Sequence, residues 1–326
     1  MTDTTIRPAR GGAPAGGGRP RRRSGADRSA TSPLQRRRAK MFWPFLLPAL
    51  LLYTVFMVGP TLASFWISLH AWDGIGEMSW RGLTNFRLLF GDPTFHTALI
   101  NTLVILLGVG AAVFAISFGL TMLLRDMAGR RFARAVIFFP SIVSPLVLAI
   151  FWGFLFQKRG LLDSFLAGLG MEQRPSFLGD HLWLIVCMGM VWMSTGLYVT
   201  IIMAGVDQIP PYLYEECDLA GATAWQRFRY VTFPLTWDVI ATTTILWTVS
   251  SLKIFDFILA FGGTTNDLPP ISTWNTALFI YGNTFGGRVP RYLFGYASAA
   301  AVVTLVTVIL LVLLLRRLTR REAVQL

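Results

Sequence analysis

Long apolar runs alternate with short polar segments along most of this chain. Six runs reach the roughly 20 residues that an α-helix needs to cross about 30 Å of hydrocarbon. They cover approximately Met41–Leu69, Ala98–Leu124, Ala135–Phe156, Trp183–Ala204, Val239–Phe261 and Phe294–Leu315. Because a chain in lipid must pair its backbone polar groups within each segment, every run is predicted to be helical. The pattern therefore predicts an all-α polytopic membrane protein with six transmembrane helices.

Composition agrees with this interpretation. Of the 326 residues, 54% are hydrophobic and only 14% are charged, and the mean hydropathy is +0.55. A soluble domain of this size cannot bury so many apolar side chains. The net charge of +12 is compatible with nucleic-acid binding, but eleven of the 29 basic residues lie in the first forty positions and most others flank the apolar runs. We read these charges as a topology signal, with membrane lipid and not nucleic acid as the partner.

Residues 1–40 are rich in Gly, Pro, Ser and Arg and contain almost no large apolar side chain. Such a segment is predicted to be a disordered, basic, cytoplasmic tail. It is not a convincing signal peptide, because the apolar run that follows is too long for an h-region. The rest of the chain, residues 41–326, is expected to form the six-span domain.

The distribution of Lys and Arg predicts the orientation. When the connecting segments are assigned alternately to the two sides, one side holds 21 basic residues and the other holds 7. The richer side carries both termini and the segment at about 205–237, here called the polar segment. Because basic residues are retained on the cytoplasmic side, both termini and the polar segment are expected to be cytoplasmic.

Prolines and glycines predict local features of the spans. Pro44, Pro48 or Pro60 is expected to kink the first span, and Pro140 with Pro145 predicts a broken or bent third span, more often a packed kink than the lining of a pathway. Glycines that allow close helix approach lie at Gly108, Gly110, Gly119, Gly189 and Gly196.

The first half of the polar segment has the features of a short helix. Pro210-Pro211 ends the preceding helix and opens a new one, since proline suits a first turn. Glu215, Glu216 and Asp218 follow near the positive end of the helix dipole. An apolar stripe is expected at Leu213, Cys217, Ala220 and Ala224.

The second half follows a glycine hinge. Gly221 is expected to bend or end the first helix, and Trp225 with Phe228 forms a second apolar step. Pro234 leads into the fifth span. The prediction is a helix, a hinge and a second helix across the cytoplasmic face.

Two explanations fit an amphipathic segment of this kind. It either rests on lipid headgroups or binds a protein. Three clustered acids would be repelled by an anionic leaflet, which favours the protein partner.

The spacing Glu215-x5-Gly221-x9-Val231-x-Phe233-Pro234 resembles the EAA loop of ABC importer permeases, whose pattern is Glu-Ala-Ala, three residues, Gly, nine residues, Ile-x-Leu-Pro. In that family the loop is a coupling helix that docks in a groove of the cytoplasmic ATPase. The resemblance implies ATPase-coupling roles for Glu215, Glu216, Asp218, Gly221, Ala222, Phe228 and Pro234.

Other stretches resemble the maltose and glycerol-phosphate type of sugar permease. They are the stretch from Asn85 through Asp92-Pro93 to Asn101-Thr102, Leu252-Lys253-Ile-Phe255-Asp256, and Gly295-Tyr296-Ala-Ser298-Ala. The resemblance implies import of a carbohydrate or related solute across a bacterial cell membrane. It also implies three kinds of partner: a second permease subunit, commonly a different chain, a cytoplasmic ATPase dimer and an extracytoplasmic solute-binding protein.

Two charged residues, Lys253 and Asp256, fall inside the fifth span. At i and i+3 on a helix they share a face, so a structural ion pair is favoured over a polar lining of the path. Trp247 and Phe255 offer flat faces for a sugar ring. Trp247, Lys253, Phe255 and Asp256 are therefore the candidate residues of a substrate path, although aromatics in spans more often serve packing.

No nucleotide-binding Gly-x4-Gly-Lys-Ser/Thr loop, His-Glu-x2-His pair or Gly-x-Ser-x-Gly elbow occurs in the sequence. We therefore expect no enzyme activity, cofactor or metal site, and energy supplied by a partner. The alternative is an integral-membrane enzyme acting on a lipid-linked substrate. In that case Glu215, Glu216 and Asp218 would be metal ligands or acid/base groups.

Overall fold

The computed structural model describes residues 44, 46–125, 127–171, 176–262 and 268–319. The predicted tail at 1–40 lies outside these residues. The chain divides into two units, Met1–Val58 and Gly59–Leu326, and the second contains most of the fold. Helices dominate the described residues, which confirms the all-α prediction.

Six helical segments are long and apolar enough to cross a membrane, which confirms the predicted number. They are Leu46–Ser68, Pro93–Arg125, Pro145–Gly168, Leu182–Val206, Trp237–Leu259 and Phe294–Arg317. The elements that make up the second unit after its first helix, α2 (Gly59–Ser68), are β1 (His70–Ala71), β2 (Ser79–Trp80), α3 (Thr84–Phe90), α4 (Pro93–Leu103), η2 (Val104–Val109), α5 (Gly110–Arg125), α6 (Arg130–Phe138), η3 (Phe139–Ser141), α7 (Pro145–Phe156), α8 (Leu161–Gly168), α9 (Leu182–Val206), α10 (Pro211–Leu219), α11 (Ala224–Arg227), η4 (Phe228–Thr232), α12 (Phe233–Leu235), α13 (Trp237–Lys253), α14 (Asp256–Leu259), η5 (Ala260–Gly262), η6 (Ile271–Thr273), α15 (Thr276–Asn283) and α16 (Phe294–Thr319).

The first span is irregular just before a proline. A π-helical turn, η1 (Thr54–Val58), precedes α2, and Pro60 is the second residue of α2. Proline has no backbone N–H to donate to the preceding turn, so one hydrogen bond of the helix is missing there. Of the three prolines that were expected to kink this span, Pro60 is therefore the one beside the irregular turn.

The second span begins earlier than hydropathy alone indicates. Asp92 caps α4 by accepting a hydrogen bond from the Thr94 backbone N–H at 2.7 Å, and Pro93 occupies the first helical position. This arrangement is favoured at helix starts because the first amide groups have no partner within the helix. The polar cap extends the helix beyond its apolar run.

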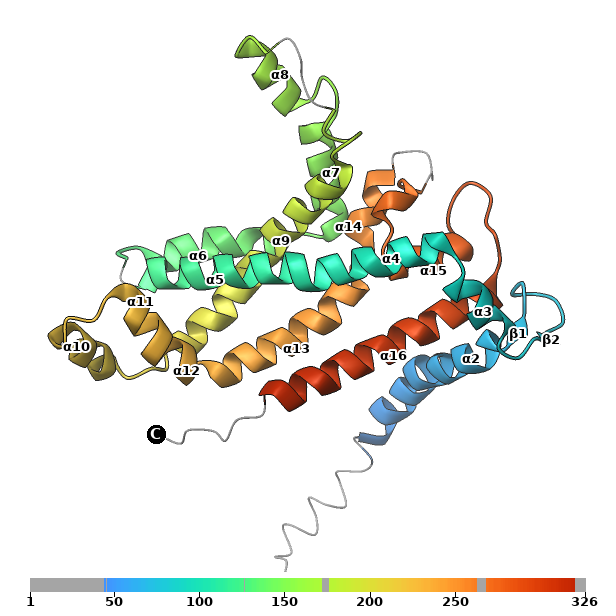
Figure 1. The fold of residues 1–326 in the computed structure, drawn as a ribbon, viewed down its shortest axis with the longest axis horizontal. Helices are drawn as coiled ribbons and strands as arrows, with labels where there is room; N and C mark the ends of the chain where they lie inside the picture. Colours follow the sequence, from blue (N-terminus) through green and yellow to red (C-terminus); the bar gives the residue numbers. More distant parts are fainter. Residues whose placement is uncertain (1–43, 45, 126, 172–175, 263–267, 320–326) are drawn as a thin grey trace, which may run out of the picture. The chain divides into compact units, whose positions relative to one another are not determined.

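The predicted third span, Ala135–Phe156, is broken, as its prolines predict. The segment α6 and η3 ends at Ser141, and α7 starts at Pro145 after Ser144 leaves the helical region. The helical segment long enough to cross a membrane is Pro145–Gly168, later than predicted, and α6 precedes it. Figure 1 shows α6 lying beside α5 and α9, which also contact it. Ser141 Oγ donates to the Met193 carbonyl at 2.7 Å and accepts from the Leu197 N–H at 3.1 Å. The break is therefore a packed one, fixed against α9.

Three of the five predicted glycines allow close approach between segments. A Cβ on Gly110 would overlap the Trp247 indole, one on Gly189 would overlap Phe257, and one on Gly196 would overlap the backbone of α6. The prediction fails for Gly119, which has open space, and for Gly108, where a Cβ would meet only Val104 of the neighbouring turn, at 3.8 Å.

Residues at one end of the spans tie distant segments together. Asn101 donates to the carbonyls of Ser272 and Trp274, both at 2.8 Å, and Tyr296 donates its hydroxyl to Asp92 at 2.7 Å. Asn85 similarly donates to the carbonyls of Ser68 and His70, at the start of β1, which forms a two-stranded antiparallel ribbon with β2. Two of the stretches that resemble sugar permeases, 85–102 and 295–299, thus supply structural ties here.

Candidate functional site

The polar segment forms the predicted helix, hinge and helix. Pro210 has a non-helical backbone conformation, with φ of −56° and ψ of 132°, and Pro211 is the first residue of α10. Proline cannot continue α9, yet its fixed φ suits a first helical turn. The double proline therefore separates α9 from α10 and sets where α10 starts.

Gly221 ends α10 in a left-handed conformation, with φ of +69°. Its N–H donates to the Asp218 carbonyl at 3.0 Å, and the Ala222 N–H donates to the Cys217 carbonyl at 2.9 Å. These two bonds make a Schellman motif, in which a left-handed residue closes the last helical turn. Glycine suits this position because residues with a Cβ rarely adopt positive φ.

The second helix has a cap that was not part of the sequence prediction. Thr223 Oγ1 accepts from the Gln226 N–H at 3.3 Å, and Gln226 Oε1 accepts from the Thr223 N–H at 2.7 Å. This is a capping box, and its sequence signal is a Ser or Thr followed three residues later by Glu or Gln. Thr223-Ala-Trp-Gln226 carries that signal, so α11 could have been located from the sequence.

The apolar stripe predicted for α10 is wrong in detail. Leu213 and Cys217 are half-buried, whereas Ala220 and Ala224 are exposed. The buried residue of α10 is Tyr214, only 4% exposed. The sequence prediction gave too little weight to tyrosine, which buries a large ring and still satisfies its hydroxyl.

Tyr214 anchors α10 to the rest of the fold. Its hydroxyl forms a hydrogen bond with Thr232 Oγ1 at 3.0 Å, and the Arg125 guanidinium lies 3.2 Å from the centre of its ring. Arg125 is the last residue of α5, so this cation–π contact joins the end of the second span to α10. A displacement of α10 would therefore act directly on α5.

The acidic residues lie on the surface of α10. Glu215, Glu216 and Asp218 are all exposed, and Asp218 forms an ion pair with Arg227 at 2.8 Å. Leu219 is 90% exposed and extends this surface. We call these four side chains, Glu215, Glu216, Asp218 and Leu219, the acidic face of α10.

An aromatic cluster supports the second half of the polar segment. Phe228 lies 5.6 Å from Phe118 of α5 and 5.9 Å from Phe233, measured between ring centres. Pro234 follows as an exposed residue of α12, and Ala222 is half-buried beside the hinge. Of the seven predicted coupling residues, the three acids share the exposed surface of α10 and Gly221 is exposed at its end, whereas Ala222 and Phe228 are half-buried and Pro234 lies on α12.

The four substrate-path candidates do not share one environment. Trp247 is 3% exposed, and its indole N–H donates to the Leu106 carbonyl at 2.8 Å. Its ring also packs against Tyr198, with ring centres 5.7 Å apart. Phe255 is half-buried and packs edge-on against Tyr281 at 4.9 Å.

The expected ion pair between Lys253 and Asp256 is absent from the described part of the chain. Helix α13 ends at Lys253, Ile254 is extended, and α14 begins at Asp256. The two side chains therefore do not share a helix face, and both are exposed. The error arose because hydropathy predicts one continuous span, whereas the backbone breaks between the two charges.

The described residues contain no group of three or more His, Cys, Asp or Glu side chains placed to hold a metal ion. The acidic face of α10 is an exposed helix surface and not a pocket that gathers carboxylates around one point. Its geometry suits contact with another macromolecule.

Comparison with known proteins assigns the family. Residues 111–324 match the family described as "Binding-protein-dependent transport system inner membrane component". Among the relatives, the lactose transport system permease protein LacF of Rhizobium radiobacter is 29% identical over 80% of this chain and 87% of its own length. The trehalose/maltose transport system permease protein MalF of Thermococcus litoralis is 30% identical over 73% of this chain and 82% of its own length.

A solved structure shows the same fold. One chain of a bacterial alginate ABC transporter, crystallised with an alginate pentasaccharide-bound periplasmic protein, superposes with a TM-score of 0.73. It is 22% identical, and the match covers 89% of this chain and 97% of that chain.

This chain belongs to the family of binding-protein-dependent transport system inner membrane components. It is a permease subunit of an ABC importer, which confirms the sequence interpretation. Such subunits are transport proteins and not enzymes, and nothing in the comparisons supports the alternative of an enzyme acting on a lipid-linked substrate. The chain is a multi-pass membrane protein that works with other components of its transporter.

Proposed function

We propose that the polar segment is the site where a cytoplasmic ATPase docks and drives the permease. The observation that carries the proposal is the exposed acidic face of α10, held by the Gly221 hinge and anchored to α5 through Arg125 and Tyr214. The fold uses Tyr214 internally but leaves Glu215, Glu216 and Leu219 exposed. An ATPase dimer that closes on nucleotide would displace α10, and the anchor would pass that movement to α5.

The solute is proposed to be a carbohydrate, most simply a disaccharide or related glycoside. LacF and MalF are named for lactose and for trehalose and maltose, and both match across most of their length. A second permease subunit of different sequence and an extracytoplasmic solute-binding protein complete the proposed transporter.

The proposed location is a bacterial cell membrane, with both termini and the polar segment in the cytoplasm. The excess of Lys and Arg on that side of the chain supports this orientation.

Within the substrate path, Lys253, Phe255 and Asp256 are the stronger candidates. They lie at the break between α13 and α14, where an interrupted helix exposes polar backbone and side chains. Trp247 is the weaker candidate because its ring is buried and its N–H already has a partner. Phe255→Ala should then reduce sugar uptake without lowering the melting temperature as much as Trp247→Ala does.

Substitution of Leu219 tests the docking proposal. Leu219 is 90% exposed, so Leu219→Asp should leave the fold intact but abolish copurification of ATP-hydrolysing activity with the full chain from detergent-solubilised membranes. Leu169→Asp is the matched control, since Leu169 is 63% exposed at the end of α8, outside the polar segment. Equal loss of ATPase activity in both variants, or in neither, would refute docking at α10.

A further inference from the structure

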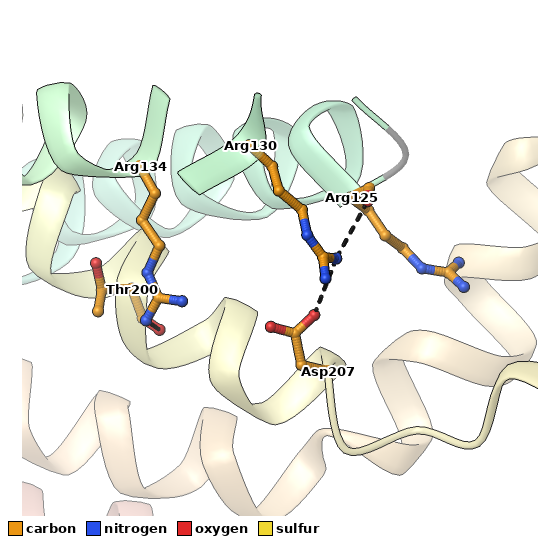
Figure 2. A network of polar contacts seen from close by, with 5 residues as sticks. All are labelled: Arg125, Arg130, Arg134, Thr200 and Asp207. Carbon is orange, nitrogen blue, oxygen red and sulfur yellow. Dashed lines mark hydrogen bonds and ion pairs between the residues drawn. The ribbon is translucent and has the colours of Figure 1, made fainter. Parts of the chain in front are cut away.

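Three arginines lie close together at the start of α6. Arg130, Arg131 and Arg134, here called the arginine cluster, are three of the first five residues of that helix. Arg125 ends α5 across the connecting turn (Figure 2). Because α6 begins where the long span Pro93–Arg125 ends, the cluster lies where a bilayer has its headgroups.

Two members of the arginine cluster are fixed against α9. Arg130 Nη1 lies 3.5 Å from Asp207 Oδ1 and donates to the Arg125 carbonyl at 3.4 Å, as Figure 2 shows. Arg134 Nη2 donates to the Thr200 carbonyl at 3.3 Å. These contacts hold the guanidinium groups in place, yet the Arg130 side chain remains 47% exposed.

Positive charge predominates at this place. Asp207 is the one carboxylate that pairs with the cluster among the described residues, and Asp126, next to Arg125 in the sequence, lies outside them. Arg131 is exposed and has no ion-pair partner within the described part of the chain. The cluster can therefore accept an anion.

An apolar groove of about 880 Å³ adjoins the same helix. It is lined by the second span, including Gly108, by Val136, Ile137 and Pro140 of α6 and η3, and by α9, including Thr195. Val136 lies five residues after Arg131, which is about 7.5 Å along a helix axis. One end of the groove therefore lies about one and a half helical turns from the arginine cluster, within the length of one phospholipid, and its walls are apolar apart from Thr195.

The outward face of α6 and η3 is also apolar after Arg131. Phe132 is 77% exposed, Val136 55% and Phe139 63%, and their spacing puts them on one side of the segment. Arg131 precedes this face. A positively charged group followed by a long apolar surface complements a phospholipid, whose phosphate lies at the membrane surface and whose acyl chains lie below it.

We propose that an anionic phospholipid binds here, with its headgroup phosphate on Arg130 and Arg131 and one acyl chain in the apolar groove. One guanidinium group can donate two parallel N–H bonds to two oxygens of the same phosphate. This bidentate geometry favours arginine over lysine as a phosphate ligand. A zwitterionic lipid carries a cationic amine that the cluster repels, whereas phosphatidylglycerol does not. The proposal is independent of ATPase docking, because it uses neither α10 nor nucleotide.

The test uses the full chain in vesicles and compares spin-labelled phosphatidylglycerol with spin-labelled phosphatidylcholine by electron paramagnetic resonance. The fraction of each lipid that is motionally restricted by the protein gives its relative association. Arg131→Gln should lower the preference for phosphatidylglycerol about fivefold, the effect expected for one basic residue at an anionic surface. Arg131→Lys keeps the charge but loses the bidentate geometry, so its loss of preference should be smaller than that of Arg131→Gln but measurable.

Arg317→Gln is the matched control, since Arg317 is exposed at the end of the last span and does not line the groove. It should change the preference less than twofold. No preference in the unaltered chain, or an equal loss in Arg131→Gln and Arg317→Gln, would overturn the proposal. Full displacement of the lipid by inorganic phosphate would also overturn it, since the site would then bind a free anion.

Gly108→Leu tests the groove separately. A Cβ on Gly108 meets only Val104, at 3.8 Å, and Gly108 lines the groove, so a leucine side chain would take up space in it. We expect the restricted fraction of phosphatidylglycerol to fall to that of phosphatidylcholine. If the restricted fraction of phosphatidylglycerol is unchanged in Gly108→Leu, the acyl chain does not occupy the groove. This conclusion holds whether or not a second permease subunit is lost on purification.

Discussion

Arg227 donates from Nη1 to Oδ1 of Asp218 at 2.8 Å, and this ion pair joins the two helices on either side of Gly221. The carboxylate side chain is 60% exposed and the guanidinium 28%. Exposed pairs of this kind contribute between 0 and about 1 kcal/mol because water screens both charges. The pair therefore orients α11 relative to α10 more than it stabilises the fold.

Asp218→Asn and Arg227→Gln should each lower the free energy of unfolding by less than about 1 kcal/mol. The double variant should lose no more than either single variant, since one interaction is removed in all three. Denaturation of the detergent-solubilised chain measures both effects. A loss well above this value, or additive losses in the double variant, would mean that each residue has a further role.

Gly221→Val should disrupt the hinge through the backbone alone. Gly221 has φ of +69° and open space around its α-carbon, so a side chain meets no obstacle. A left-handed conformation nevertheless costs an L-residue roughly 1–2 kcal/mol, and a β-branched residue more. We expect normal membrane insertion but loss of sugar uptake and of substrate-stimulated ATP hydrolysis in the assembled transporter.

Gly221→Asn is the control for that substitution, because asparagine tolerates the left-handed region better than other residues with a Cβ. Uptake should be largely retained in this variant. Normal uptake by Gly221→Val would show that the hinge does not transmit movement.

Asn101→Ala should destabilise the fold strongly. Asn101 is 7% exposed and donates to two backbone carbonyls more than 170 positions away in the sequence, at Ser272 and Trp274. Truncation leaves both carbonyls without this donor, and an unsatisfied buried polar group costs about 1–3 kcal/mol. A fall in melting temperature would confirm the tie, with Asn101→Gln as a comparison that retains the amide.

The link between Asp92 and Tyr296 predicts a dependence on pH. Burial raises the pKa of Asp92, but hydrogen bonds from the Tyr296 hydroxyl and the Thr94 N–H outweigh it and hold the pKa below its usual value. A lowered pKa in the fold means that Asp92 contributes stability above its unfolded pKa and loses it as the pH falls through the folded value.

Tyr296→Phe removes one of the lowering contacts, so the pKa of Asp92 should rise. Because acid removes stability only between the unfolded and the folded pKa of Asp92, the acid-induced loss of stability should be smaller than in the unaltered chain and should end at a higher pH. Melting temperatures between pH 3 and pH 7 measure the shift, a range chosen to include the usual pKa of aspartate at about 3.9. Identical pH profiles for the two proteins would contradict the link.

Several features could be predicted from local sequence because their causes are local. Apolar length determines the spans, the double proline at 210–211 starts α10, and Gly221 supplies the positive φ that closes it. The capping box at Thr223 and Gln226 has an equally local cause, because its sequence signature spans only four residues. In each case the residue and its consequence lie within one or two helical turns.

The sequence by itself therefore determined the six spans, the broken third span and the helix, hinge and helix of the polar segment. Only the tertiary structure decided that Tyr214 anchors α10 through Arg125, that α13 breaks between Lys253 and Asp256, and that Trp247 is buried against Gly110. These outcomes depend on which segments pack together, and residues far apart in the chain supply the partners. The hydrophobic pattern of a segment predicts how apolar its helix is. It does not predict which neighbouring segment each side chain contacts.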